Sequence, residues 1–328
     1  MVEPFLLKPA CKDYIWGGKR LAAEYGKDYG VSPLAETWEC STHPDGVSVV
    51  NSGNYKGLGL DELLEMHPEL LGTHPAKNCS TGQLPILIKF IDAAQSASVQ
   101  VHPDDAFAKI YENGQRGKAE MWYILDAEAD SKLIYGFNHN MARETVESAL
   151  KDGTIERYLN KVNVRKDDVF YVEPGTVHAI GAGMVLVEIQ QNSNLTYRMY
   201  DYDRKDSNGN RRELHVDKAL QVMKYKGDSK PRQPMRVLKY QPGCAVELLC
   251  RCKYFQVERM LLNADEKSPR TIFRMDSSSF VVLVCLEGEA RLLGREFLKL
   301  KKGDCLFVPA GERNICMEGK AQFLKIRC

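Results

Sequence analysis

The stretch SVQVHPDD, which begins at Ser98, carries side chains that could do chemistry at every second position. Ser98, Gln100 and His102 alternate with two valines until a proline ends the pattern. Alternation with period two is typical of a half-buried β-strand. A polar strand face usually meets solvent. An imidazole and an amide on one face are also suited to line a cavity and to bind a metal ion.

Two segments of the chain share one frame, which indicates an internal duplication. In KDDVFYVEPGTVHAIGAG, Asp168 is followed by a glycine at seven residues and by His178 at ten. In KGDCLFVPAGERNICMEG, Asp304 is followed by a glycine at seven residues and by Asn314 at ten. In each copy a turn leads into a strand, and a proline–glycine turn leads out of it.

Strand signals dominate the elements that must position these residues. Short β-branched and aromatic runs separated by turn residues are typical of a β-sandwich or barrel. The runs are VSVVNSG, ILIKFI, SVQVH, MWYILD, DVFYVEPG, MVLVEIQ and FVVLVCLEG. Apolar residues at helical spacing predict helices within 60–71, 143–159 and 216–225, as insertions on a β core.

Composition excludes several classes of protein. The 328 residues include 45 Lys and Arg against 44 Asp and Glu, without a basic cluster interleaved with aromatics, so a nucleic-acid partner is not expected. The apolar runs LPILI and FVVLVCL are too short to span a bilayer, and the first residues do not resemble a signal peptide. Ten scattered cysteines without a CxxC pair are typical of buried thiols in a reducing compartment. These features predict a soluble, cytoplasmic protein.

The duplicated frame, with its pattern GD…PxGxxH, resembles the cupins, which hold a metal ion inside a jelly-roll barrel. Two copies imply a mainly β bicupin, with two double-stranded β-helix barrels and helical insertions. We expect an N-terminal catalytic cupin domain at residues 1–240 and a C-terminal metal-free cupin domain at 241–328. The boundary falls near YQPGCA, which begins at Tyr240.

The cupin resemblance aligns four candidate metal ligands in the first copy, namely Gln100, His102, Glu120 and His178. Two imidazoles and a carboxylate suit Zn²⁺ and leave a position open for substrate, whereas the amide of Gln100 is a weaker ligand. Without the resemblance, the two histidines would be interpreted as ordinary core or surface residues.

The second copy lacks these ligands. Asn314 stands where the first copy has His178, and Val281 stands approximately where it has Glu120. We therefore expect one zinc ion per chain, in the N-terminal barrel, and a structural C-terminal barrel.

Four segments resemble the signatures of type I mannose-6-phosphate isomerases: QVHPDD, GKAEMWYIL, PGTVHAIGAG and EIQQNSNLTYRMYDYDR. YIWGG and ETWECS also fit, and the similarity runs to about Lys224, in a chain whose length suits the shorter bacterial branch. The resemblance implies interconversion of mannose 6-phosphate and fructose 6-phosphate through a cis-enediol, with a divalent metal polarising the carbonyl. It also implies a small-molecule sugar phosphate substrate and a monomer.

The resemblance assigns the catalytic roles to Arg198 and Glu188. Arg198 would stabilise negative charge in the transition state, although the residues alone also allow a pair with Asp201 or Asp203. Glu188 would carry the proton, although a carboxylate that only orients a metal ligand is the alternative.

The resemblance assigns substrate binding to four residues. Lys118 lies two residues before Glu120, hence on the same strand face if the strand extends that far. The phosphate end is expected at Lys89, Ser98 and Arg204.

Two alternative functions remain for such a site. An Fe²⁺-dependent cupin dioxygenase would be expected to carry a further histidine in place of Gln100, and it would not need cations for an anionic substrate. A non-catalytic sugar-binding cupin would not need all four ligands together with Arg198 and Lys118.

Overall fold

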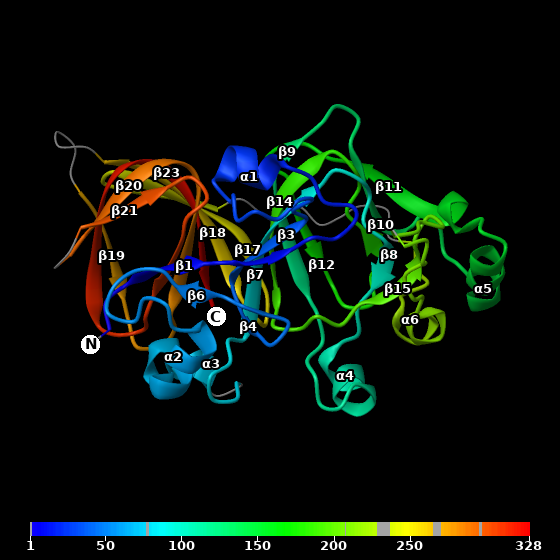
Figure 1. Ribbon diagram of the computed structural model, residues 1–328, viewed down its shortest axis with the longest axis horizontal. Coiled ribbons are helices and arrows are strands. Elements are labelled where there is room, and N and C mark those ends of the chain that lie inside the picture. Colours follow the sequence, from blue (N-terminus) through cyan, green and yellow to red (C-terminus); the bar gives the residue numbers. More distant parts are fainter. Residues whose placement is uncertain (1, 77–78, 207, 228–236, 265–269, 295–296) are drawn as a thin grey trace.

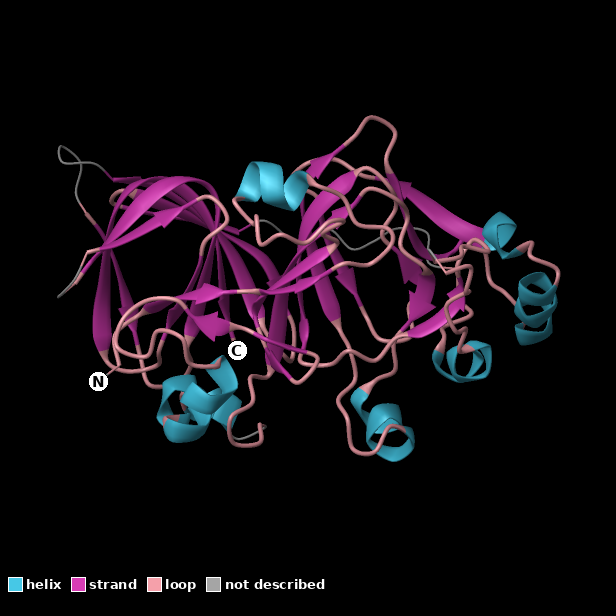
Figure 2. Ribbon diagram, in the orientation of Figure 1, coloured by secondary structure: helices cyan, strands magenta, loops and turns pink. Residues whose placement is uncertain are grey.

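The computed structural model describes residues 2–76, 79–206, 208–227, 237–264, 270–294 and 297–328. Figures 1 and 2 show a mainly β molecule with two β barrels side by side. The barrel that contains the C-terminal strands lies at one end, and the barrel built from the middle of the chain lies at the other. The predicted mainly β bicupin fold is confirmed.

Two antiparallel sheets form the N-terminal barrel. The six-stranded sheet has the order β12 (Val169–Val172), β9 (Glu120–Ala127), β14 (Met184–Gln191), β7 (Ile86–Ala93), β3 (Glu36–Cys40) and β2 (Ala10–Lys12). The five-stranded sheet has the order β11 (Leu159–Asn163), β10 (Lys132–Phe137), β13 (His178–Ala179), β8 (Val99–Val101) and β15 (Tyr197–Tyr200). A separate two-stranded ribbon joins β4 (Thr42–His43) to β5 (Gly46–Val47).

A ten-stranded sheet forms the C-terminal barrel. Its main path is β16 (Val237–Gln241), β17 (Cys244–Arg251), β18 (Gln256–Ala264), β23 (Arg313–Arg327), β20 (Val281–Leu293), β22 (Cys305–Val308), β1 (Phe5–Lys8) and β6 (Val49–Val50). β19 (Thr271–Met275) pairs with β23, and β21 (Leu298–Lys301) pairs with β20. The division at residues 240 and 241 stays a prediction. In this sheet, β1 from the start of the chain pairs with β22, and β6 pairs with β1.

Helices lie outside the barrels, as the sequence predicts. They are α1 (Arg20–Tyr25), α2 (Leu60–Met66), α3 (Thr73–Ala76), α4 (Asp105–Tyr111), α5 (Arg143–Lys151) and α6 (Val216–Val222), with 3₁₀ turns at η1 (Pro68–Leu71) and η2 (Ile155–Tyr158). The three predicted helices are shorter than expected. Pro68 lacks the N–H that would continue α2, and Gly153, with φ of +66°, adopts a left-handed conformation after α5.

The apolar core is arranged in layers around the two barrels. Phe90 and Tyr123, on the outer face of the six-stranded sheet, pack in one cluster with Val282 and Leu324 of the C-terminal barrel. The other face of that sheet looks into the N-terminal barrel. The outer face of the five-stranded sheet packs under α5 and α6. The interior of the N-terminal barrel lies between these two apolar layers. Part of it is polar, and the rest is a further apolar cluster that includes Ile91, Trp122 and Leu186.

Within the described residues, none of the helices is both long and apolar enough to cross a membrane.

Candidate metal centre

Strand β8 carries the alternating residues as the sequence predicts. Val99 and Val101 are fully buried in the cluster under the outer helices. Ser98, Gln100 and His102 belong to the opposite face. The register aligns Gln100 with His178 of β13 on one side and with Arg198 of β15 on the other. Three neighbouring strands thereby present a row of polar side chains to the barrel interior.

His102, Glu120 and His178 meet at one point, and each is buried. The Nε2 atom of His102 lies 3.0 Å from Oε1 of Glu120, and Nε2 of His178 lies 3.7 Å from Oε2. The side-chain nitrogen of Gln100 lies 3.4 Å from Nε2 of His178, so the amide borders the same point. One donor atom from each of the two histidines and Glu120 lies within 4.8 Å of the others.

The hydrogen bonding of His178 and Glu120 is compatible with a bound cation. Nδ1 of His178 lies 2.8 Å from the carbonyl oxygen of Thr176 and donates to it, so the lone pair is on Nε2. Neither carboxylate oxygen of Glu120 accepts a well-formed hydrogen bond, although both are buried. Buried lone pairs without donors fit a cation bound among them.

Electrostatics hold these groups in the protonation state that a metal requires. Burial, reinforced by the charge of Lys118, lowers the pKa of His102 to about 3. Burial also lowers the pKa of His178. Burial opposes ionisation of Glu120, but Lys118 and His102 hold the pKa of that carboxyl well below its usual value. Two neutral imidazoles and a carboxylate result, which is the deprotonated ligand set that binds a divalent ion.

Lys118 reaches the same cluster, but not from a strand. Strand β9 begins at Glu120, so the condition under which Lys118 would share its strand face is not met. The backbone N–H of Lys118 instead donates to the carbonyl of Pro103. The ammonium group is buried and lies 2.9 Å from Oε1 of Glu120 and 3.4 Å from Nε2 of His102.

A second charged row lies on the facing sheet. The register aligns Trp122, Glu188, Lys89 and Trp38 across four strands. Oε1 of Glu188 lies 3.1 Å from the ammonium of Lys89, and Oε2 accepts a 2.8 Å bond from the indole of Trp122. Glu36, two residues before Trp38, lies 3.4 Å from the same ammonium. Lys89 is therefore held between two buried carboxylates.

The Glu188 carboxyl has an unusual affinity for protons. Burial and the charge of Glu120 raise its pKa, and Lys89 opposes this. Burial disfavours the charged form of Lys89, but Glu36 and Glu188 nevertheless raise its pKa. The surroundings of Glu188 thus favour its protonated form, which suits a carboxyl that takes up a proton.

Arg198 forms neither of the ion pairs that the residues alone allow. Its Nε donates to the hydroxyl of Ser98 at 3.3 Å, and its Nη1 donates to the carbonyl of Glu213 at 2.7 Å. Asp201 is bound by Arg204 and Arg212 instead. Burial and the charge of Arg212 lower the pKa of Arg198, with Asp201 opposing, so an anion beside it would be favoured.

Four site residues are missed by the sequence interpretation. Arg212 reaches Asp201 from the loop after β15, and Glu36 reaches Lys89 from β3. Burial and the charge of Glu36 raise the pKa of Tyr14 to about 12, while Lys89 and Arg212 oppose this rise. Tyr14 therefore lies near these charged side chains. Gln190 aligns with Glu120 and has a buried amide oxygen without a hydrogen bond. Of these four residues, Tyr14 and Glu36 had a signal in the sequence, because they begin the segments YIWGG and ETWECS.

The buried cluster of candidate metal ligands inside one of two β barrels defines an enzyme of the bicupin class. Two family descriptions match the chain: "Phosphomannose isomerase type I, catalytic domain" at residues 5–121 and "Mannose-6-phosphate isomerase, cupin domain" at residues 246–327. The mannose-6-phosphate isomerase ManA of Bacillus subtilis is 38% identical over 324 residues, 98% of this chain and 97% of that protein. The mannose-6-phosphate isomerase of Streptococcus mutans is 37% identical, over 94% of this chain and 93% of its own length.

Solved structures agree with these relatives. The crystal structure of a mannose 6-phosphate isomerase from Bacillus subtilis matches with a TM-score of 0.90 and 32% identity, covering 99% of each chain. A putative mannosephosphate isomerase from Archaeoglobus fulgidus shares the fold, with a TM-score of 0.76. The chain belongs to the type I phosphomannose isomerase family.

Proposed function

We propose that the chain interconverts mannose 6-phosphate and fructose 6-phosphate at the buried cluster of His102, Glu120 and His178. The observation that carries this proposal is the meeting of that cluster with Lys118 inside one barrel. The relatives are named mannose-6-phosphate isomerases over nearly the full length of the chain, which supports the same aldose–ketose isomerase activity.

His102, Glu120 and His178 are the proposed metal ligands, with Gln100 as a weaker fourth. The oxygens of Glu120, which accept no well-formed hydrogen bond, and the two neutral imidazoles fit a divalent ion. We propose Zn²⁺ because nitrogen and carboxylate ligands suit it. When bound, such an ion polarises the sugar carbonyl and stabilises negative charge on oxygen.

Glu188 is the proposed proton carrier between C1 and C2 of the sugar. Its raised pKa lets it hold the proton between abstraction and return, and the indole of Trp122 fixes one of its oxygens. The alternative, that Glu188 only orients a ligand, is less favoured because its hydrogen bonds go to Trp122 and Lys89 rather than to His102 or His178.

Lys118 and Arg198 are proposed to stabilise the charge that develops on the enediol oxygens. Each is a cation on the inner side of the barrel, and Arg198 has no carboxylate partner among the described residues that could neutralise it locally. Such preorganised donors act most strongly where water is excluded.

The phosphate end is proposed at Ser98 and Arg204, beside Arg198. Ser98 contacts Arg198, and the Nε of Arg204 is buried without a hydrogen-bond partner. Binding of phosphate by Lys89 stays a prediction. The position of Lys89 between Glu36 and Glu188 favours a different role, which is to set the protonation of Glu188.

We further propose a monomeric enzyme of the cytoplasm whose C-terminal barrel holds no metal. The ten cysteines are free thiols, which supports a reducing compartment. Val281 and Ile315 lie in an apolar cluster inside the C-terminal barrel, and the only group of three His, Cys, Asp or Glu side chains suited to a metal among the described residues is His102, Glu120 and His178 in the other barrel. The dioxygenase and the sugar-binding alternatives are not favoured, because the relatives are named isomerases.

A coupled assay that reports fructose 6-phosphate formed from mannose 6-phosphate tests the proposed activity. The wild-type chain should turn over the substrate, and His178→Ala should lose activity together with bound metal. His139→Ala, at an exposed histidine, is the matched control and should behave as wild type. A metal-loaded wild-type chain without isomerase activity would overturn the proposal.

A further inference from the structure

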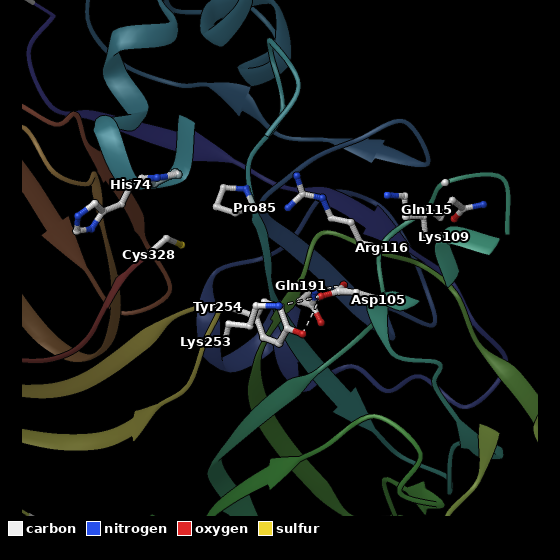
Figure 3. A pocket seen from close by; sticks show the side chains of 12 residues that line it. His74, Pro85, Asp105, Lys109, Gln115, Arg116, Gln191, Lys253, Tyr254 and Cys328 are labelled. Atoms are coloured by element: carbon white, nitrogen blue, oxygen red, sulfur yellow. Dashed lines mark hydrogen bonds and ion pairs between the residues drawn. The ribbon is translucent and has the colours of Figure 1, made fainter. Parts of the chain in front are cut away.

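The side chain of Asp105 joins the two barrels near the metal cluster. Asp105 is the first residue of α4, and Asp104 already caps that helix by accepting the N–H of Phe107. Its Oδ2 accepts a 2.8 Å bond from the hydroxyl of Tyr254, which lies in the turn between β17 and β18 of the C-terminal barrel. Its Oδ1 accepts a 2.9 Å bond from the side chain of Gln191, at the end of β14. Figure 3 shows the three side chains converging.

Gln191 also binds the segment 117–119, which directly precedes the candidate metal ligand Glu120. Its Oε1 accepts the backbone N–H of Ala119 at 3.0 Å, and its own N–H donates to the carbonyl of Ala119 at 3.1 Å. Asp105 also accepts the backbone N–H of Gly117 at 3.0 Å. Ala119 lies directly between Lys118 and Glu120. Every residue from 117 to 119 is therefore fixed through its backbone.

The Asp105 carboxyl is suited to hold several donors at once. Burial alone would raise its pKa, but the hydrogen bonds from Gln191, Tyr254 and Gly117 hold the pKa below its usual value. It is therefore ionised near neutral pH, and bonds to a charged acceptor are stronger than neutral ones. A cavity of about 640 Å³ opens beside these side chains, so the bonded groups border open space on one side.

We propose that Tyr254, Asp105 and Gln191 are positioning residues through which the C-terminal barrel orients Lys118 and Glu120 toward the metal. The inference rests on the proposed function, and it gives the metal-free barrel a part in the reaction. Partners that orient a metal ligand typically contribute about 10- to 100-fold to metal affinity or activity. Tyr254 would then act through two other side chains, without touching metal or substrate.

The test measures Zn²⁺ affinity of the full chain by competition with a chromophoric chelator, on metal-free protein. Gln191→Met keeps the side-chain length and removes both side-chain bonds, so it should weaken Zn²⁺ binding about 10- to 100-fold. Tyr254→Phe removes one hydroxyl and should weaken it by roughly tenfold at most. Tyr225→Phe is the matched control. Its hydroxyl donates to the carbonyl of Leu220 beneath the outer helices, and its loss should leave Zn²⁺ affinity unchanged.

Two further comparisons separate positioning from simple support of the fold. Asp105→Asn can still accept from Gly117 and Gln191, so it should retain more Zn²⁺ affinity than Asp105→Ala. The double variant of Tyr254→Phe and Gln191→Met should bind Zn²⁺ about as weakly as Gln191→Met alone, because both act on one path.

Wild-type Zn²⁺ affinity in Tyr254→Phe and Gln191→Met, with unfolding temperatures lowered as in Tyr225→Phe, would overturn the inference. Additive losses in the double variant would also overturn it. Failure of the proposed function is a separate result. A wild-type chain that binds Zn²⁺ without turning over mannose 6-phosphate contradicts the function, while the affinity comparison still decides the positioning role.

Discussion

At the scale of single residues, the surroundings of Arg198 lead to a specific expectation about its role. Its guanidinium contacts Ser98 and a backbone carbonyl, while Asp201 is occupied by two other arginines. A cation that is not neutralised by a local carboxylate can stabilise charge that appears only in the transition state.

Arg198→Ala should therefore lower kcat by about 100- to 1000-fold, with a smaller change in KM. Arg198→Lys keeps the charge but loses the planar fork, so it should recover only part of the rate. Steady-state kinetics on mannose 6-phosphate, with metal content checked for each variant, measures this. Wild-type kcat with a raised KM would mean that Arg198 only binds substrate.

Lys89 has two candidate roles, which are to bind the phosphate group and to set the protonation of Glu188. Because Lys89 is held between Glu36 and Glu188, we expect Lys89→Met to lower kcat by about 10- to 100-fold, since Glu188 loses the cation that sets its protonation. The same kinetics distinguishes the phosphate role. A raised KM with unchanged kcat would show that Lys89 binds the phosphate group.

At the scale of elements, the sequence predicts what depends on local pattern and misses what depends on strand order. The alternation in SVQVH identified β8 and its polar face, and helical spacing found three insertions. Glu36 and Lys89 meet because β3 and β7 are neighbours, although 52 positions separate them in the chain. Arg212 reaches Asp201 across a loop that has no strand period. Neither contact leaves a periodic signal in the sequence.

Because Asp201, in the loop after β15, is paired with two arginines, the free energy of unfolding should depend on pH in the acid range. Burial alone would raise the pKa of Asp201, but Arg212 and Arg204 hold it below its usual value. A carboxyl with a lowered folded pKa stabilises the fold above its unfolded pKa, about 3.9, and loses that contribution as pH falls through the folded value.

Asp201→Asn should therefore cost on the order of 3 kcal/mol of unfolding free energy at pH 7, because it leaves two half-buried arginines uncompensated. The difference from wild type should begin to shrink below about pH 4, where the carboxyl of the unfolded chain takes up protons, and it should be lost as pH falls through the lower pKa of the folded state. Thermal unfolding between pH 3 and pH 7 checks this. A difference that stays constant over that range would exclude Asp201 as the titrating group.

At the scale of the whole molecule, we expect the two barrels to have different roles. The N-terminal barrel would hold the reaction site, and the C-terminal barrel would support it. The N-terminal barrel holds the candidate ligands beside an apolar cluster, whereas the cluster inside the C-terminal barrel consists of apolar residues. The barrels nevertheless share a core, because Phe90 and Tyr123 pack with Val282 and Leu324.

A chain that ends at residue 240 should not fold stably, because it exposes the apolar face of the six-stranded sheet and leaves β1 without β22. Soluble yield, circular dichroism and thermal unfolding of the truncated chain measure this. A truncated chain that unfolds cooperatively at the wild-type temperature would show that the two barrels are independent.

The central expectation is that one divalent metal at His102, Glu120 and His178 is required for isomerisation. The decisive measurement strips the wild-type chain with a chelator, restores Zn²⁺ stepwise and follows turnover of mannose 6-phosphate against bound metal. We predict that turnover disappears on stripping and returns in proportion to bound metal, reaching its maximum at one ion per chain. Full turnover in the stripped chain would contradict the requirement for a metal at these three residues.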